Sequence, residues 1–110
     1  MVENVYKVKD LLNNLDTTLH VPVRLGTMMM LYLNSSLTFS NIQKGLGVTS
    51  GNLNTHLTNL NSKGYIKQEK EFINVRPRTV VKITPEGKKA VKSYVKSLKS
   101  VLSELGELYE

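Results

Sequence analysis

Residues 40–64 restrict the fold of this 110-residue chain more than any other segment. Ser40 begins a short predicted helix with Gln43 three residues later, which is the spacing of a capping box, and Gly47 ends that helix. A second predicted helix follows a tight turn and ends at Gly64. One apolar stripe runs along it, formed by Leu53, Leu57 and Leu60. Two short helices joined by a tight glycine-containing turn predict a helix-turn-helix.

Two predicted strands follow directly. Residues 65–71 alternate between apolar and polar side chains, and residues 79–83 are rich in β-branched side chains, so both segments predict strands. The predicted loop between them, residues 72–78, ends with Arg76-Pro77-Arg78. We therefore expect a fold that is mainly α with a small β-hairpin, in the α+β class.

Apolar stripes also mark the helices at the two ends of the chain. The first predicted helix covers residues 3–18, and the last begins at Thr84-Pro85-Glu86 and continues to residue 108. The spacing suits helix packing across a two-fold axis, and a domain of this size cannot easily cover both stripes. The alternative is that the stripes pack only on each other within one chain. We expect a homodimer whose interface is formed by Val5, Val8, Leu12, Leu15, Val91, Val95, Leu98, Leu102 and Leu105.

The predicted helix over residues 22–34 is apolar on nearly every side, which indicates a central position. Pro22 suits the first position of this helix, because its missing N–H would have no partner there. The run Met28-Met29-Met30 has two interpretations, the filling of a core or the border of a cavity for a small-molecule effector. Core filling is the more frequent use of methionine.

The charge of the chain indicates a polyanionic partner. Fifteen Lys and Arg side chains against nine Asp and Glu give a net charge of +6, and residues 38–84 alone hold +5 of it. Cysteine is absent and the two histidines are far apart in the sequence, so we expect neither a metal nor a cofactor. The sequence has no Gly-rich phosphate loop and no supported catalytic triad, which argues against an enzyme. It also lacks a signal peptide and a membrane-length apolar run, so we expect a cytoplasmic protein without a membrane partner.

The second helix of the pair, which Thr49 or Ser50 caps, has an outer face suited to the major groove of DNA. Opposite its leucines this face holds only Ser, Gly, Asn and Thr, with no acid to repel phosphate. Asn bonds bidentately with adenine, and Thr contacts the methyl group of thymine. The alternative is an ordinary solvated face, but such a face usually contains stronger helix formers such as Glu and Lys. The candidate DNA-contacting residues are Ser50, Gly51, Asn52, Thr55 and Asn59.

Other polar side chains are candidates for contacts with the DNA backbone. Arg76 and Arg78 flank the stiff Pro77 and are placed to reach the minor groove or adjacent phosphates. The alternative is a charged hairpin tip that only keeps a strand edge in solution. In the first helix of the pair, the candidates for phosphate contacts are Ser40, Gln43 and Lys44. We expect His56 to be packed and hydrogen-bonded rather than in contact with a base, and His20 to be structural.

Several stretches together form a family pattern: HVPVRL at residues 20–25, VTSGNLNTHL at 48–57, LNSKGYI at 60–66, and RPRT at 76–79 leading into ITPEG at 83–87. With them, residues 20–91 resemble the winged-helix DNA-binding family of MarR/ArsR-type transcriptional regulators. The resemblance implies a recognition helix near residues 49–62, a wing near residues 71–79 and a homodimer on a pseudo-palindromic operator. The chain departs from the pattern at Thr55, where relatives often carry Arg, so bidentate guanine recognition is not expected there.

These features predict one winged-helix domain over residues 1–110. Residues 1–19 form an N-terminal dimerisation helix, residues 20–84 a winged helix-turn-helix core and residues 85–110 a C-terminal dimerisation helix. We expect a sequence-specific transcriptional regulator that binds double-stranded DNA, with the recognition helix in the major groove and the basic wing on the adjacent minor groove. One alternative is a protein-interaction module, which needs an exposed apolar patch such as Phe72, Ile73 and Val75. Another is a non-specific, chromatin-like DNA binder.

Overall fold

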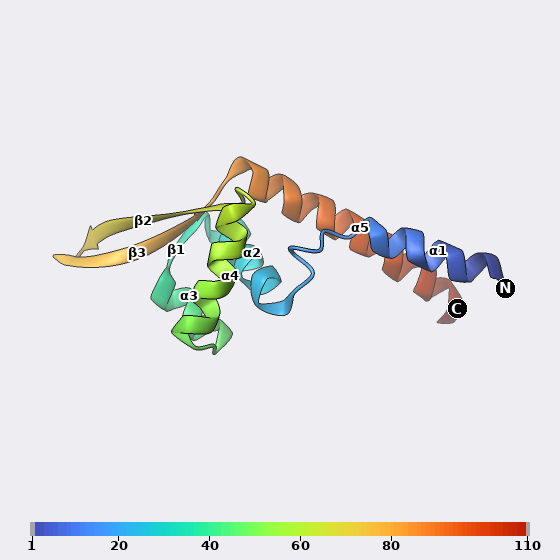
Figure 1. Cartoon of the computed structure of the whole chain (residues 1–110), viewed down its shortest axis with the longest axis horizontal. Helices are drawn as coiled ribbons and strands as arrows, with labels where there is room; N and C mark the ends of the chain where they lie inside the picture. Colours follow the sequence, from blue (N-terminus) through green and yellow to red (C-terminus); the bar gives the residue numbers. More distant parts are fainter. Residues whose placement is uncertain (1, 110) are drawn as a thin grey trace.

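The helices and strands follow the predicted order, with one additional strand. The computed structural model describes the backbone of residues 2–109 and the side chains of residue 5 and residues 7–106. The elements are α1 (Val2–Asn13), α2 (Pro22–Asn34), β1 (Ser36–Thr38), α3 (Phe39–Leu46), α4 (Ser50–Ser62), β2 (Ile66–Ile73), β3 (Arg76–Ile83) and α5 (Pro85–Tyr109). Helices predominate over one small antiparallel sheet, which confirms the predicted fold class (Figure 1).

The sheet has the strand order β1-β3-β2, and β1 is the strand that the sequence analysis missed. It pairs with β3 through only three residues, and Leu37 lies opposite Val81. The hairpin of β2 and β3 is longer than predicted, because residues expected in a loop pair as far as Ile73 opposite Arg76. Pro77 is tolerated in β3 because β1 pairs only with residues 80–82, so one edge of the strand is open at the proline.

The helix-turn-helix forms as predicted, but the cap of its first helix lies two residues earlier. Thr38 rather than Ser40 caps α3, and its hydroxyl accepts a bond of 3.1 Å from the backbone N–H of Asn41. Thr38 takes this role because it is the last residue of β1 and has the extended backbone of a capping residue. Thr49 caps α4, which was one of the two candidates. Gly47 ends α3 in the left-handed conformation, with φ of 65°.

The core lies where α2, α3 and α4 pack on the sheet and on the first half of α5. The leucine stripe of α4 is fully buried in it, as predicted. Two other predictions were wrong. Helix α2 is central on one side only, since Met28 is buried whereas Met29 and Leu33 are exposed. Helix α1 ends at Asn13 instead of residue 18, so Leu15 reaches the core from the connection after the helix.

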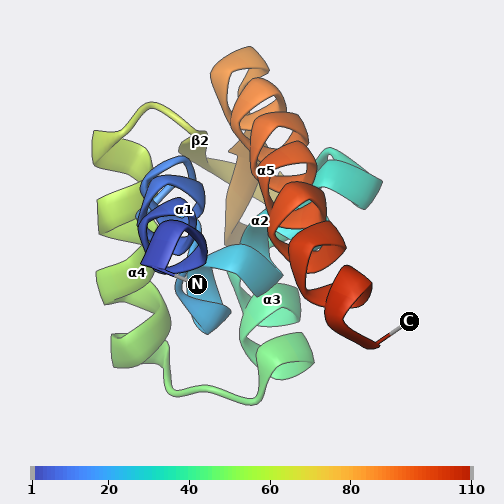
Figure 2. The ribbon, with the colours of Figure 1, turned by 90° about the vertical axis from the view of Figure 1, so that its right-hand side faces the viewer.

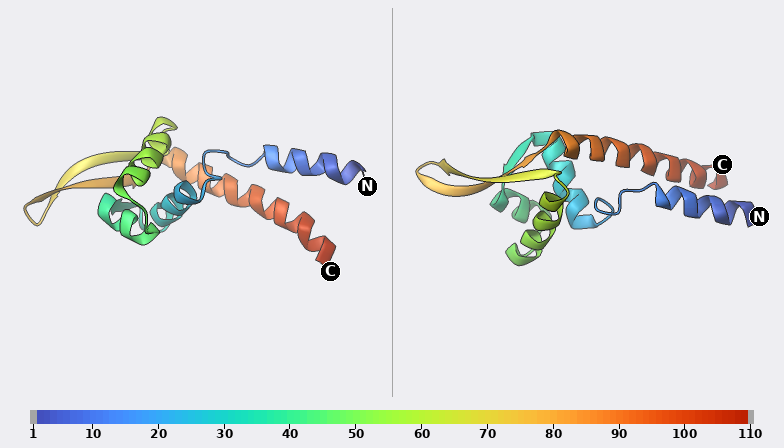
Figure 3. Two further views of the ribbon diagram at one scale, coloured as in Figure 1. Left: turned by 60° about the horizontal axis from the view of Figure 1, so that its bottom comes forward. Right: turned by 45° about the horizontal axis from the view of Figure 1, so that its top comes forward.

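The molecule is elongated, with principal extents of 62, 25 and 22 Å. The hairpin of β2 and β3 projects at one end of the long axis, and α1 lies beside the second half of α5 at the other (Figures 1 and 3). Figure 2 looks at this second end, with α1 and α5 in front of the remaining helices. A salt bridge of 2.9 Å joins Lys7 of α1 to Glu104 of α5. Within the described residues, no helix combines the length and the apolar character needed to cross a bilayer.

Candidate nucleic-acid interface

Helix α4 has a buried apolar side and an open polar side. Ser50, Gly51, Asn52 and Thr55 are all exposed, and a Cβ atom added to Gly51 would meet no atom within 4 Å. The hydroxyl of Thr55 donates to the carbonyl oxygen of Gly51 at 3.0 Å, so it keeps only acceptor capacity toward a ligand. The open side is therefore flat and formed by short side chains.

Arg24 of α2 connects the central helix to α4, and the sequence analysis did not identify it. Its guanidinium donates to His56 Nδ1 at 3.2 Å, to Asn59 Oδ1 at 3.0 Å and to the carbonyl oxygen of Thr18 at 3.3 Å. His56 is thus half-buried and hydrogen-bonded, as expected. Arg24 is the one basic residue of an otherwise apolar helix, which is the sequence feature that could have indicated a structural contact.

Asn59 is the candidate DNA-contacting residue that differs most from the expectation. It is half-buried at the flank of α4, and its side-chain oxygen is already bonded to Arg24. Only its amide nitrogen remains for another contact, whereas bidentate pairing with adenine uses both the oxygen and the nitrogen. The bond to Arg24 therefore ties the flank of α4 to α2 and leaves Asn59 one polar group toward a base.

The hairpin of β2 and β3, which we call the wing, keeps both predicted arginines exposed. Neither Arg76 nor Arg78 forms an ion pair with another residue in the described part of the chain. Both acids of β2, Glu69 and Glu71, form salt bridges of 3.1 Å with Lys82 Nζ. These two bonds raise the pKa of Lys82. Residues 66–83 hold five Lys and Arg against these two acids, so the wing is net positive.

The three candidates on α3 lie in different positions. Lys44 is exposed in the last turn of the helix, and Gln43 is half-buried. The backbone carbonyl oxygen of Gln43 accepts the N–H groups of Gly47 and Val48 at 2.9 and 3.4 Å, so this residue also stabilises the turn before α4. Ser40 lies half-buried in the first turn of α3 rather than at its cap.

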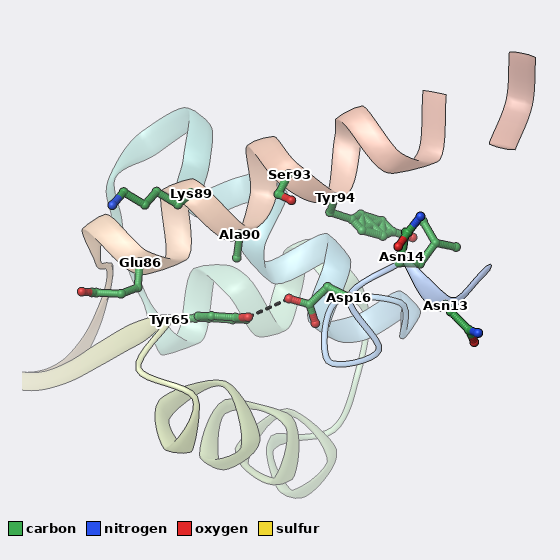
Figure 4. Close-up of a pocket in the computed structure, with 10 residues that line it drawn as sticks. Asn13, Asn14, Asp16, Tyr65, Glu86, Lys89, Ala90, Ser93 and Tyr94 are labelled. Atoms are coloured by element: carbon green, nitrogen blue, oxygen red, sulfur yellow. Dashed lines mark hydrogen bonds between the residues drawn. The ribbon is translucent and has the colours of Figure 1, made fainter. Parts of the chain in front are cut away.

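A polar pocket of about 500 Å³ lies away from this surface, between the connection after α1 and the first half of α5 (Figure 4). The Tyr65 hydroxyl donates to Asp16 Oδ2 at 2.6 Å, and Asp16 Oδ1 accepts the N–H groups of Thr18 and Leu19. Burial raises the pKa of Tyr65 to about 12, and the bond and negative charge of Asp16 add to the shift. These contacts join the N-terminal connection to the start of β2.

His20 makes a second contact in this region. Its Nδ1 lies 2.6 Å from the hydroxyl of Tyr94 in α5, which agrees with the structural role expected for it. Burial raises the pKa of Tyr94, with a smaller effect from Asp16. Within the described residues, no group of three His, Cys, Asp or Glu side chains is placed to hold a metal ion.

Comparisons with known proteins agree with this geometry. A family model described as a winged helix DNA-binding domain matches residues 23–102. A transcriptional regulator homologue from Pyrococcus horikoshii is 40% identical, with a TM-score of 0.80 over 91% of this chain and 97% of that one. An uncharacterised protein of Methanocaldococcus jannaschii is 34% identical over 73 residues, which are 66% of this chain and 79% of the relative. The YusO protein of Bacillus subtilis, at 17% identity, shares the fold with a TM-score of 0.74 over 94% of this chain and 74% of that one.

Proposed function

The chain belongs to the winged-helix DNA-binding domain family, and on this premise we propose that it is a sequence-specific transcriptional regulator that binds double-stranded DNA as a homodimer. The observation that carries the proposal is the open polar side of α4, which lacks charged side chains and lies in the same domain as a positive wing. A solvated helix face gains nothing from poor helix formers, whereas a face that enters the major groove needs short polar side chains.

In this proposal α4 enters the major groove with its N-terminal end leading. The Thr49 hydroxyl accepts the N–H of Asn52, which leaves the N–H groups of Ser50 and Gly51 to bind a phosphate. The side chain of Asn52 pairs with adenine, and the methyl group of Thr55 contacts thymine. Recognition therefore favours A·T pairs beneath α4.

The wing and α3 supply contacts that do not depend on sequence. Arg76 and Arg78 bind phosphates at the adjacent minor groove, and Lys44 with its neighbours Ser40 and Gln43 binds the backbone beside the major groove. Each phosphate that a cation neutralises releases counterions, so affinity falls steeply as salt rises.

The homodimer is supported by apolar side chains that the single chain leaves uncovered. Of the predicted interface, Leu15 and Val91 are largely buried within the single chain, and Leu98 packs partly against the core, so these three side chains have little apolar surface left to offer a partner. The exposed members of the stripes are Val5, Val8, Leu12, Val95, Leu102 and Leu105. Burial of such side chains in a dimer removes apolar surface from water, which favours association.

The exposed stripe of α5 continues onto α2. A mostly apolar groove of about 360 Å³ lies between the two helices, lined by Met29, Tyr32 and Leu33 of α2 and by Val91, Lys92 and Val95 of α5. This groove exists because α2 buries only one side against the core. We propose that a second copy of the chain covers it. An operator with half-sites one turn of DNA apart requires the two α4 helices of such a dimer to lie about 34 Å from each other.

Selection of bound fragments from genomic DNA, followed by footprinting, tests the function. We expect a two-fold symmetric footprint and an affinity that falls with salt. The double variant Arg76→Ala/Arg78→Ala should weaken binding to every sequence and reduce the salt dependence. Lys96→Ala/Lys99→Ala removes the same charge from exposed positions on α5 and should leave the footprint unchanged.

The same experiment separates the alternatives. Binding without sequence preference would indicate a chromatin-like protein, because the ratio of specific to non-specific affinity would then be low. Absence of salt-dependent binding to any fragment would refute the DNA-binding proposal and favour a protein-interaction module.

A further inference from the structure

The tip of the wing is apolar, which its proposed contact with DNA phosphates does not explain. Phe72 is 78% exposed, Ile73 40% and Val75 93%. Phe72 lies opposite Pro77 in the hairpin, and the apolar side chains that anchor the sheet to the core, Ile66 and Val81, lie at its other end. The fold therefore does not use the tip residues as core.

The backbone of the tip is strained. Asn74 and Val75 form a two-residue turn with φ of 54° and 67°, both in the left-handed region. Asn followed by Gly is the usual pair in such a turn, and a β-branched residue is an outlier there. Strain of this kind costs of the order of 1–3 kcal/mol and is found mostly at functional sites. The tip is also narrow, because only two residues connect the paired strands.

The charges around the tip favour a polyanion as its partner. Arg76 and Arg78 follow the turn, and Lys70 precedes it; all three are exposed. The neighbouring acids, Glu69 and Glu71, are bonded to Lys82. An apolar point surrounded by cations complements a nucleic-acid groove, in which bases lie between two rows of phosphates.

We propose that the wing tip is a wedge that bends DNA. The side chains of Phe72 and Val75 enter the minor groove and partly separate two stacked base pairs, while Arg76 and Arg78, on one face of β3, bind phosphates at the edge of the groove. Apolar wedges of this kind kink a duplex by about 20–90°. The step beneath the tip is then a flexible pyrimidine–purine step, because such steps unstack at the least cost. This inference rests on the proposed function.

The test compares the parent protein with Phe72→Ser/Val75→Ser on a duplex chosen by genomic selection. Energy transfer between dyes at the two ends of the duplex reports its bend, and 2-aminopurine at the step beneath the wing reports unstacking. At saturating protein we expect the parent to shorten the end-to-end distance and raise the 2-aminopurine fluorescence. The double variant should bind the same site without either change.

Arg78→Ala is the matched control, because it removes a cation from the wing and keeps the wedge. It should weaken binding, yet bend the duplex fully once the site is saturated. Both changed side chains of the double variant are exposed, so its melting temperature should stay within a few degrees of the parent.

The outcomes distinguish this inference from the proposed function. If the parent binds its site specifically but leaves the duplex straight, or if the double variant bends it equally, the wedge proposal is overturned and the proposed regulator function remains supported. The apolar tip is then better explained as a contact for a protein. Absence of specific DNA binding overturns both proposals.

Discussion

Replacement of Arg24 by alanine tests whether a half-buried contact between α2 and α4 holds α4 in place. Arg24 donates three hydrogen bonds of 3.0, 3.2 and 3.3 Å, two of them to side chains of α4. Hydrogen bonds from a charged donor contribute about 1.5–3 kcal/mol each. Arg24 and its two α4 partners are half-buried and two of the bonds are long, so we count only the shortest bond, to Asn59, and expect a loss of about 2 kcal/mol.

The assay is thermal unfolding followed by circular dichroism. For a chain of this length, about 2 kcal/mol corresponds to a fall in melting temperature of about 8 °C. Arg24→Lys should recover only part of this loss, because an ammonium group cannot reproduce the fork that reaches both His56 and Asn59. Lys99→Ala, which removes a cation from an exposed position, is the control and should leave the melting temperature unchanged.

Affinity for the selected operator gives a second readout. At a temperature where both proteins are folded, Arg24→Ala should weaken specific binding by about tenfold, the value of one lost base contact. A melting temperature within 2 °C of the parent, or an operator affinity unchanged by the substitution, would show that Arg24 does not position α4.

Four further changes have defined outcomes. The raised pKa of Tyr65 means that its protonated hydroxyl stabilises the folded state below pH 10, and that this stabilisation is lost as the pH rises to about 12. Between these pH values, the free energy of unfolding measured with urea should therefore fall more in the parent than in Tyr65→Phe. Gly87→Ala places a Cβ 2.2 Å from the carbonyl oxygen of Tyr65 and should lower the free energy of unfolding by about 2 kcal/mol. Leu102→Glu, at an exposed stripe position, should sediment as a monomer. Val75→Gly should relieve turn strain, raising the free energy of unfolding by about 1 kcal/mol, and reduce DNA bending.

Each of these predictions has a contrary result, and the first two have a control. Tyr32→Phe, which removes a hydroxyl outside the polar pocket, is the control for Tyr65→Phe. If the free energy of unfolding falls equally at alkaline pH in the parent and in Tyr65→Phe, Tyr65 is not the source of that fall. Gly51→Ala meets no neighbouring atom, so equal costs at the two glycines would refute the steric argument for Gly87. A dimeric Leu102→Glu would move the interface away from the stripe. A Val75→Gly protein less stable than the parent would show that the turn is unstrained.

The sequence predicted those parts of the molecule that depend on neighbours within one or two helical turns. The leucine stripe of α4, the cap at Thr49 and the end of α3 at Gly47 are local patterns, and all three are observed. The cap of α3 was misassigned because Thr38 owes its extended backbone to the pairing of β1 with β3, a contact between residues more than forty positions apart.

Periodicity likewise indicated which helices have an apolar side, but not what covers that side. Leu15 and Val91 continue the stripes of Val8 and Val95, yet the first two are core residues and the last two are exposed. In α5 the difference arises because Tyr94 and Leu98, on either side of Val95 in the sequence, pack against the core, whereas Val95 faces the open groove beside α2, and no spacing along the chain records which face is covered.

The amino-acid sequence was sufficient to determine the helix-turn-helix, the hairpin, the basic middle of the chain and the polar outer side of α4, since each follows from spacing and residue type over short distances. The fold in three dimensions decided that Arg24 bonds to His56 and Asn59, that Asp16 bonds to Tyr65, and that the apolar residues of the wing lie at a narrow strained tip. Such contacts join residues 32 to 49 positions apart, or depend on strand register, and both emerge only when the whole chain packs at once.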